Sequence, residues 1–215
     1  MKNNGKYFFS VVNKDEFISS VWDPYVYKRN GNSYILSDFA TLSKPTSRKI
    51  SLTETPYQPI EYRDIPEGDY LSFSLREQKH MPKSSFPIVG ENELLFGTMR
   101  AYLANIIITP LSSWVQKESP IYFPIKSEFL LVSPHDKLSY FWLAFLRSHV
   151  FLDSLPLGSG GTRPRLHLDS LGQTPVLVPP LHDRLIIHNQ LKELAMNEWQ
   201  NYCKVFFAIN SLNQK

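Results

Sequence analysis

The stretch between residues 140 and 191 decides the expected fold. It begins with YFWLAFL at residues 140–146, continues with GSGGTRPR at 158–165 and VLVPPL at 176–181, and ends in a polar segment of helical spacing. In order, these segments predict an apolar helix, a glycine-rich hinge with two arginines, a short strand, a proline pair and a long helix.

The first of these segments belongs to a longer helical pattern. Apolar side chains between residues 138 and 155 recur at intervals that line one broad face of a helix. Asp136 suits the start of such a helix because of the helix dipole, and the glycines from Gly158 onward suit its end. We therefore predict a packed helix over residues 136–155.

Upstream, short apolar segments separated by prolines predict β-strands. Residues 70–75 alternate between apolar and polar side chains, and the segments 93–97, 104–109, 121–125 and 129–132 are apolar or β-branched. Prolines between them suit short strands with bulges or edges. The predicted fold class is α+β: a globular domain with a twisted, mostly antiparallel sheet and packed helices, followed by a long C-terminal helix.

The C-terminal segment is the clearest predicted helix, because neither glycine nor proline interrupts residues 181–212. An apolar seam of heptad-like spacing runs along it, formed by Leu191, Ala195, Trp199, Tyr202, Phe206 and Ile209. We expect part of this seam to meet another chain. The chain would then divide into a globular domain (residues 1–180) and a spacer or dimerisation helix (residues 181–215). The alternative is a helix folded back on its own domain.

The composition is that of a globular protein. Hydrophobic residues make up 42% and aromatic residues 13% of the 215 residues, enough for a core. The net charge of +3 is mildly basic and gives only weak support for nucleic-acid binding. Cys203 is the sole cysteine, which suits a reducing compartment. No segment has the pattern of a signal peptide or a membrane span, so we expect a soluble, cytoplasmic protein.

Common catalytic signatures are missing from the sequence. The glycines at 158–161 have no lysine of the kind that a phosphate-binding loop needs, and the histidines form no pair with metal-ligand spacing on a predicted helix. Asp23-Pro24-Tyr25 is only a fragment of the motif of amino-group DNA methyltransferases. We therefore expect a protein that is not an enzyme and that has no metal and no cofactor.

Loops between the predicted strands carry basic and amide side chains of the kinds that bind DNA. Lysine and arginine bind phosphates, and arginine and glutamine also contact base edges. Any one such residue alone suits an ordinary solvated surface, but as a group they lie in loops, where binding residues concentrate. The candidate DNA-binding residues are Lys44, Arg48, Lys49, Arg76, Gln78, Lys79, Lys83, Arg100, Tyr102, Arg163 and Arg165.

Four segments, taken in order, resemble one protein family. They are WDPYVY at residues 22–27, YRDIPEG at 62–68, ENELLFGTMRAYL at 91–103 and PPL at 179–181. Their order and spacing are similar to those of a target recognition domain from the DNA specificity subunit of type I restriction–modification systems. One departure is Asp183-Arg184, where members of that family usually have a glutamate and a glutamine.

The resemblance implies sequence-specific recognition of double-stranded DNA on behalf of a methyltransferase subunit and a restriction subunit carried by other chains. A full specificity subunit has two recognition domains and two long helices. This chain therefore resembles a half-subunit that forms a homodimer, or pairs with a second half, through its C-terminal helix. The alternative is a helix-mediated protein-interaction module that does not bind DNA; an enzyme of unrecognised type is a third possibility.

Overall fold

A four-stranded antiparallel sheet forms the centre of the structure, a computed structural model that describes residues 34–48, 55–78 and 85–212. The segment 22–27 lies outside the described residues. The strand order is β2 (Ala40–Ser43), β8 (Phe129–Pro134), β5 (Leu94–Gly97) and β6 (Ile106–Ile108). The predicted strands at 93–97, 104–109 and 129–132 are confirmed as β5, β6 and β8; β8 and β5 are the inner strands, and β6 lies at an edge.

Two smaller antiparallel sheets flank the central one. One contains β3 (Ser47–Arg48), β4 (Phe86–Val89) and β7 (Phe123–Pro124), and the other pairs β1 (Tyr34–Ile35) with β9 (Pro175–Val176). β7 and β9 confirm, in shortened form, the strands predicted near 121–125 and 176–178. The α+β class and the mostly antiparallel sheet are therefore confirmed.

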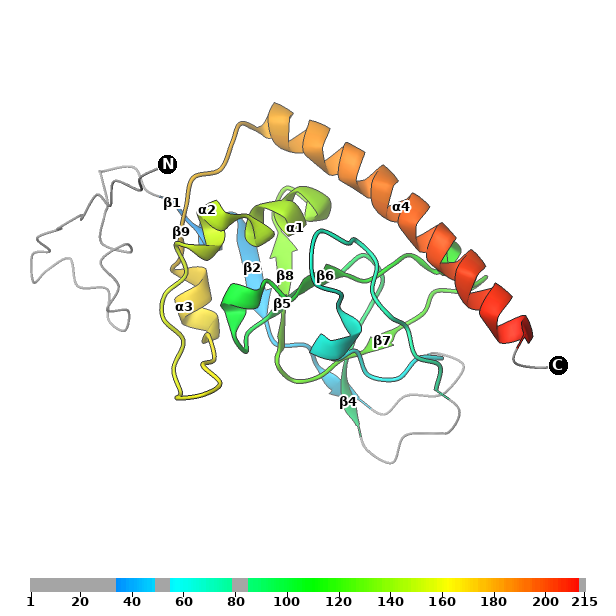
Figure 1. Cartoon of the computed structure of the whole chain (residues 1–215). Coiled ribbons are helices and arrows are strands. Elements are labelled where there is room, and N and C mark those ends of the chain that lie inside the picture. The colour runs from blue at the N-terminus through cyan, green and yellow to red at the C-terminus, as the bar shows by residue number, and fades with distance from the viewer. Residues whose placement is uncertain (1–33, 49–54, 79–84, 213–215) are drawn as a thin grey trace, which may run out of the picture.

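Helices cover the central sheet (Figure 1). They are α1 (Ser139–Arg147), α2 (His149–Leu152), α3 (Leu168–Gly172) and α4 (Leu181–Leu212). Short 3-10 helices lie between the strands: η2 (Leu36–Asp38), η3 (Tyr62–Asp64), η4 (Ala101–Leu103) and η5 (Ser112–Val115). The single helix predicted over 136–155 is divided into α1 and α2. The division falls at Ser148, whose backbone is extended and whose hydroxyl accepts the Phe151 N–H of the next helix.

The predicted strand at 70–75 is wrong, although its alternation is correct. Phe73 and Leu75 are buried as the alternation predicts, but this segment is not part of a strand. Side chains of α4 satisfy its backbone instead. The Glu198 carboxylate accepts the N–H groups of Leu71 (3.0 Å) and Ser72 (2.8 Å), and the Tyr202 hydroxyl accepts the Leu75 N–H (2.9 Å).

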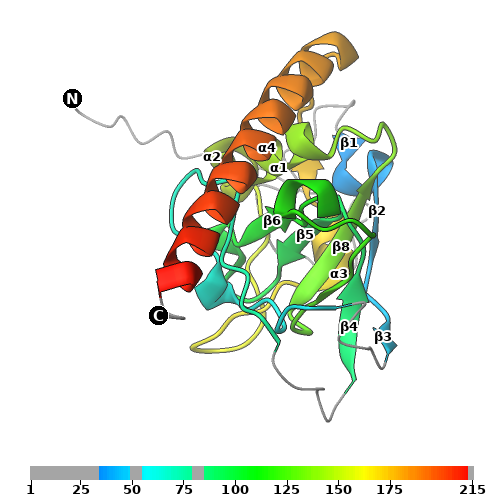
Figure 2. The same cartoon turned by 90° about the vertical axis from the view of Figure 1, so that its right-hand side faces the viewer.

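The helix α4 has the predicted bounds, but it packs along its own globular body, on α1 and η5 (Figures 1 and 2). Ala195 and Trp199 are fully buried, and the Trp199 ring meets the Phe73 ring edge to face at 5.0 Å. The expectation that this seam meets another chain is therefore wrong for these two residues. The seam is apolar because it covers the core of this chain.

The rest of the seam is less buried. Leu191 and Tyr202 are half-buried against the core, and Phe206, also half-buried, stacks on Tyr202. The side chain of Ile209 lies outside the described part of the structure. The inward face of the helix thus extends from Leu191 to at least Phe206.

An ion pair attaches the first turn of α4 to the segment before α1. Arg184 binds Asp136, and both side chains are largely buried. The other carboxylate oxygen of Asp136 accepts the Leu138 N–H and the Trp142 indole N–H, each at 3.0 Å. Asp136 therefore links two helices, and Arg184 has a structural role.

We expect Trp199→Ala to destabilise the fold by about 3–5 kcal/mol, because it removes a fully buried aromatic ring from the core. Urea denaturation followed by circular dichroism measures the change. Leu194→Ala on the same helix is the matched control, since Leu194 is 56% exposed, and it should change stability by less than about 0.5 kcal/mol. Equal effects of the two changes would contradict the inward packing of α4.

A double-mutant cycle tests the ion pair. Arg184→Met should cost about 2–3 kcal/mol, because it leaves a largely buried carboxylate without its cation. Asp136→Asn keeps an oxygen acceptor for Leu138 and Trp142 and removes only the charge. The two effects should be coupled by more than about 1 kcal/mol in the double variant, and purely additive effects would show that the pair contributes nothing.

Candidate nucleic-acid interface

Some of the candidate DNA-binding residues that the structure describes have exposed side chains, and others form part of the hydrogen-bonded fold. Lys44, Arg100, Tyr102, Arg163 and Arg165 are exposed. Arg48 lies in β3, where its backbone pairs with Phe86, and Gln78 donates its backbone N–H to the Pro56 carbonyl. Three candidates, Lys49, Lys79 and Lys83, lie outside the described residues.

Arg76 is engaged within the fold. Its guanidinium donates to both carboxylate oxygens of Asp64 at 2.8 Å, to the Gln58 side chain at 2.7 Å and to the Pro59 carbonyl at 3.0 Å. The hydrogen bond with Asp64 raises the pKa of Arg76. Four of its N–H groups are thus committed to protein acceptors, so Arg76 stabilises this region and does not join the interface described below.

The glycine-rich segment 158–165 is a hairpin fixed at its base. Ser159 and Arg165 exchange backbone hydrogen bonds of 2.9 and 2.8 Å. A Cβ on Gly158 would lie 3.1 Å from the Arg165 backbone, and Gly160 has a φ of +101°, so both positions favour glycine. The predicted hinge is therefore a closed loop whose tip, residues 160–163, is exposed.

This hairpin is held against the turn that follows β5. The Arg100 N–H donates to the Pro164 carbonyl at 2.8 Å, and the Leu166 N–H donates to the Thr98 carbonyl at 3.0 Å. The Arg100 side chain adds a bond of 3.3 Å to the Thr162 carbonyl. Two candidate segments, distant in sequence, are thereby brought together.

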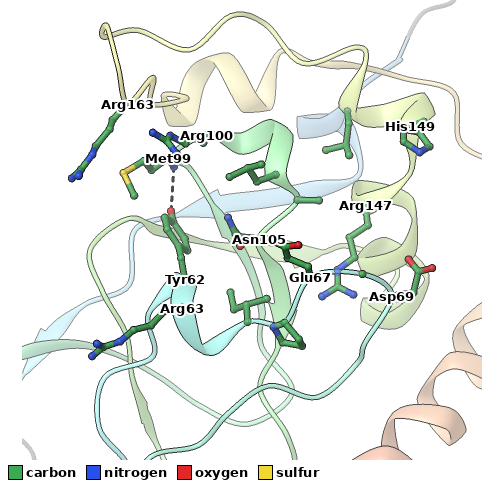
Figure 3. A pocket seen from close by; sticks show the side chains of 16 residues that line it. Tyr62, Arg63, Glu67, Asp69, Met99, Arg100, Asn105, Arg147, His149 and Arg163 are labelled. Atoms are coloured by element: carbon green, nitrogen blue, oxygen red, sulfur yellow. Dashed lines mark hydrogen bonds between the residues drawn. The ribbon is translucent and has the colours of Figure 1, made fainter.

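A groove of about 960 Å³ lies beside this junction (Figure 3). Its cationic end is formed by Arg63, Arg100 and Arg163. Its other end holds Arg147 near Asp69. The groove therefore has one end that suits an anionic ligand and one end of mixed charge.

Two smaller hollows, of about 340 Å³ each, continue the groove. The first shares Tyr62, Arg63 and Met99 with the groove and also contains Lys126. The second shares Glu128 with the first and contains two candidate residues, Lys44 and Arg165. We call this connected surface, from Lys44 to Arg163, the basic face.

Acidic residues on the basic face pair only weakly with its cations. Arg63 lies 3.0 Å from Glu61 and Arg165 lies 3.7 Å from Glu128, but the two arginine side chains are 68% and 61% exposed. Ion pairs at such exposure contribute little to stability. A phosphate group can therefore replace these carboxylates as the partner of the arginines.

Tyr62 was not among the candidate residues, although it opens the YRDIPEG segment. It lies at the centre of the basic face, where its hydroxyl joins two segments of the chain. Its hydroxyl donates to the Glu128 carbonyl at 3.2 Å and accepts the Met99 N–H at 3.1 Å, and burial raises its pKa to about 12. A Cβ on Gly97 would lie 2.7 Å from both the Tyr62 ring and the Asn105 carbonyl oxygen. Gly97 therefore allows the close approach of Tyr62 to β5.

Arg63, Lys126 and Arg147 were also missed as members of the site. Arg147 donates to the Ile106 and Tyr70 carbonyls, and burial lowers the pKa of its guanidinium. It ends an apolar helix, and nothing in that pattern places it at a groove. Arg63 lies within the YRDIPEG segment, which was singled out by resemblance and could have indicated it.

Within the described residues, no group of three or more histidine, cysteine, aspartate or glutamate side chains could hold a metal ion. In the same part of the chain, no helix is both long and apolar enough to cross a membrane.

Solved structures with a similar fold include the following two. The HsdS subunit from Thermoanaerobacter tengcongensis is 16% identical with a TM-score of 0.49, and the similarity covers 76% of this chain and 41% of that chain. A chain from work on complex assembly and conformational transition of the type I R-M system is 14% identical with a TM-score of 0.45, covering 82% and 42%. This chain thus spans less than half the length of either. No protein-family model and no curated protein matches the sequence.

We expect Gly97→Ala to destabilise the fold by about 1–3 kcal/mol, because the new methyl group would meet a backbone carbonyl and a buried ring. Gly161→Ala is the matched control, since a Cβ there has no neighbour within 4 Å. Thermal unfolding of the two variants measures the difference, and a neutral Gly97→Ala would contradict the packing at the centre of the basic face.

Proposed function

We propose that this chain binds double-stranded DNA and recognises a base sequence. The observation that carries the proposal is the basic face, on which five exposed cationic side chains lie along connected hollows. They are Lys44, Arg63, Arg100, Arg163 and Arg165.

The distribution of these charges favours a polymer over a small anion. A site for a small anion brings its cations to one point, whereas here they are spread along three hollows. A DNA duplex presents a phosphate charge about every 1.7 Å along its axis and so matches a row of separated cations. The exposed Tyr102 and the loop tip at 160–163 add side chains and backbone groups that can contact base edges.

We further propose that the chain is a specificity half-subunit of a type I restriction–modification system. Two of the segments that resemble this family, 62–68 and 91–103, contribute to the same groove. The resemblance and the basic face therefore coincide in space. In this role the chain selects the DNA site, and methyltransferase and restriction subunits on other chains perform the chemistry.

A second recognition domain would pair through the outer flank of α4, since the inner flank is buried. Leu194 and Val205, which are about three turns apart and so lie on one side of this helix, are 56% and 59% exposed. A homodimer formed in this way would have two-fold symmetry and would favour a palindromic target in two halves. A second, different half-subunit would give an asymmetric target.

DNA binding should depend steeply on salt. Phosphate contacts by Lys44, Arg63 and Arg165 predict a slope of about −2.7 in a plot of log K against log salt, so a rise from 50 to 200 mM should weaken binding by about 40-fold. Fluorescence anisotropy with a labelled duplex measures this. Lys44→Ala with Arg165→Ala should reduce the slope by about 2.

Lys117→Ala is the control for this experiment, because Lys117 is exposed and lines none of the three hollows. It should leave both affinity and slope unchanged. The exposed apolar residues of α4 also support the alternative, a protein-interaction module without DNA binding. A chain that associates with itself or a partner but shows no salt-dependent binding to any duplex would favour that alternative.

A further inference from the structure

We propose that Arg163 is the residue of the basic face that determines base preference, by contacting a guanine edge, whereas Arg165 and Lys44 bind phosphates. This assignment rests on the proposed DNA-binding function. It follows from how differently the structure holds these three side chains.

The loop that carries Arg163 is rigid at its base and open at its tip. Its two ends are joined by the paired backbone bonds of Ser159 and Arg165, and the turn after β5 holds it through Arg100 and Thr98. Among the residues that the structure describes, none lies within 4 Å of a Cβ built on Gly161, and residues 160–163 are exposed. A side chain on this tip projects from a fixed position without belonging to the packed core.

Arg163 itself is exposed and makes no hydrogen bond or ion pair with any residue that the structure describes. Figure 3 shows it extending outward at the mouth of the groove, near Met99 and Arg100. All of its guanidinium N–H groups are free to meet a ligand. A guanidinium fork matches the O6 and N7 acceptors of guanine in the major groove, the most frequent specific contact between proteins and DNA.

Arg165 lies in a different environment. Its backbone N–H and carbonyl both bond to Ser159, and its side chain lies 3.7 Å from Glu128. The bonds of the neighbouring Pro164 and Leu166 place it opposite Met99 in a β-bridge. It shares a hollow with Lys44 against the body of the protein. Two cations in one shallow hollow suit the phosphate backbone, which fixes position but carries no base information.

Arg100 is a positioning residue for Arg163. Its backbone N–H and its guanidinium bond the carbonyls of Pro164 and Thr162, on either side of Arg163 in the chain. Its own φ of +51° is left-handed, a conformation uncommon for a residue other than glycine. The turn after β5 therefore holds the loop that carries Arg163, and Arg100 itself is not free to contact a ligand.

The test uses the full chain and a pool of random-sequence duplexes. Wild-type protein should enrich a motif from this pool. Dissociation constants are then measured for the enriched duplex and for a scrambled duplex. Arg163→Ala should lower the preference between the two by about 10- to 100-fold, and its selection should no longer favour guanine at one position. Arg163→Lys, which keeps the charge but not the fork, should retain affinity for the scrambled duplex and still lose the preference.

Arg165→Ala is the matched control, and it should weaken binding to both duplexes by the same factor while the enriched motif stays the same. All variants should melt at the wild-type temperature, because both side chains are exposed. If Arg163→Ala and Arg165→Ala change both duplexes equally while wild type keeps its motif, the assignment is overturned and the proposed function stands. If wild-type protein enriches no motif, the proposed function fails, and the assignment fails with it.

Discussion

The inward packing of α4 is the constraint on which the basic face depends. Glu198 and Tyr202 bind the backbone of residues 71–75, and Trp199 covers Phe73. That segment in turn holds η3, because the Ser74 N–H donates to the Asp64 carbonyl and Arg76 binds the Asp64 carboxylate. The next contact, from Tyr62 of η3 to Met99, reaches the turn that presents Arg100. A continuous series of bonds therefore joins the helix to the face, although they lie on different parts of the molecule.

This series of bonds limits how α4 can connect the domain to a partner chain. Its inner flank is occupied by the core of its own domain, so a partner helix can use only the exposed flank with Leu194 and Val205. An assembly formed there would place the basic face at a fixed orientation to the partner, because the helix cannot swing without breaking the bonds of Glu198 and the pair of Arg184 with Asp136. We infer that α4 both supports the domain and sets its direction, which a freely projecting rod would not do.

The sequence predicted elements whose signals are local and missed contacts whose partners are distant. β5, β6 and α4 were predicted because an apolar run, or a long segment without glycine and proline, is enough to indicate each one. Residues 70–75 have the alternation of a strand, but their partners are side chains about 127 positions later. The seam of α4 was identified, but the same spacing serves a partner chain or the protein's own core. Arg76 and Arg163 are both loop arginines in the sequence, and only the folded structure shows that Arg76, half-buried, is engaged by Asp64, Gln58 and Pro59.

Packed positions and exposed positions have different roles in this domain. This difference explains how such a domain can change its ligand preference at little cost in stability. Gly97, Gly158 and the Tyr62 ring lie where added atoms meet backbone or core, so changes there would disturb the fold. Residues 161–163 are exposed and lie beyond the fixed base of the hairpin. Substitutions there remove no buried contact, and surface substitutions of this kind usually change stability by less than about 0.5 kcal/mol. A loop whose base is determined by packing and whose tip is not can therefore vary its proposed contacts with DNA while the sheet, the groove and α4 stay as they are.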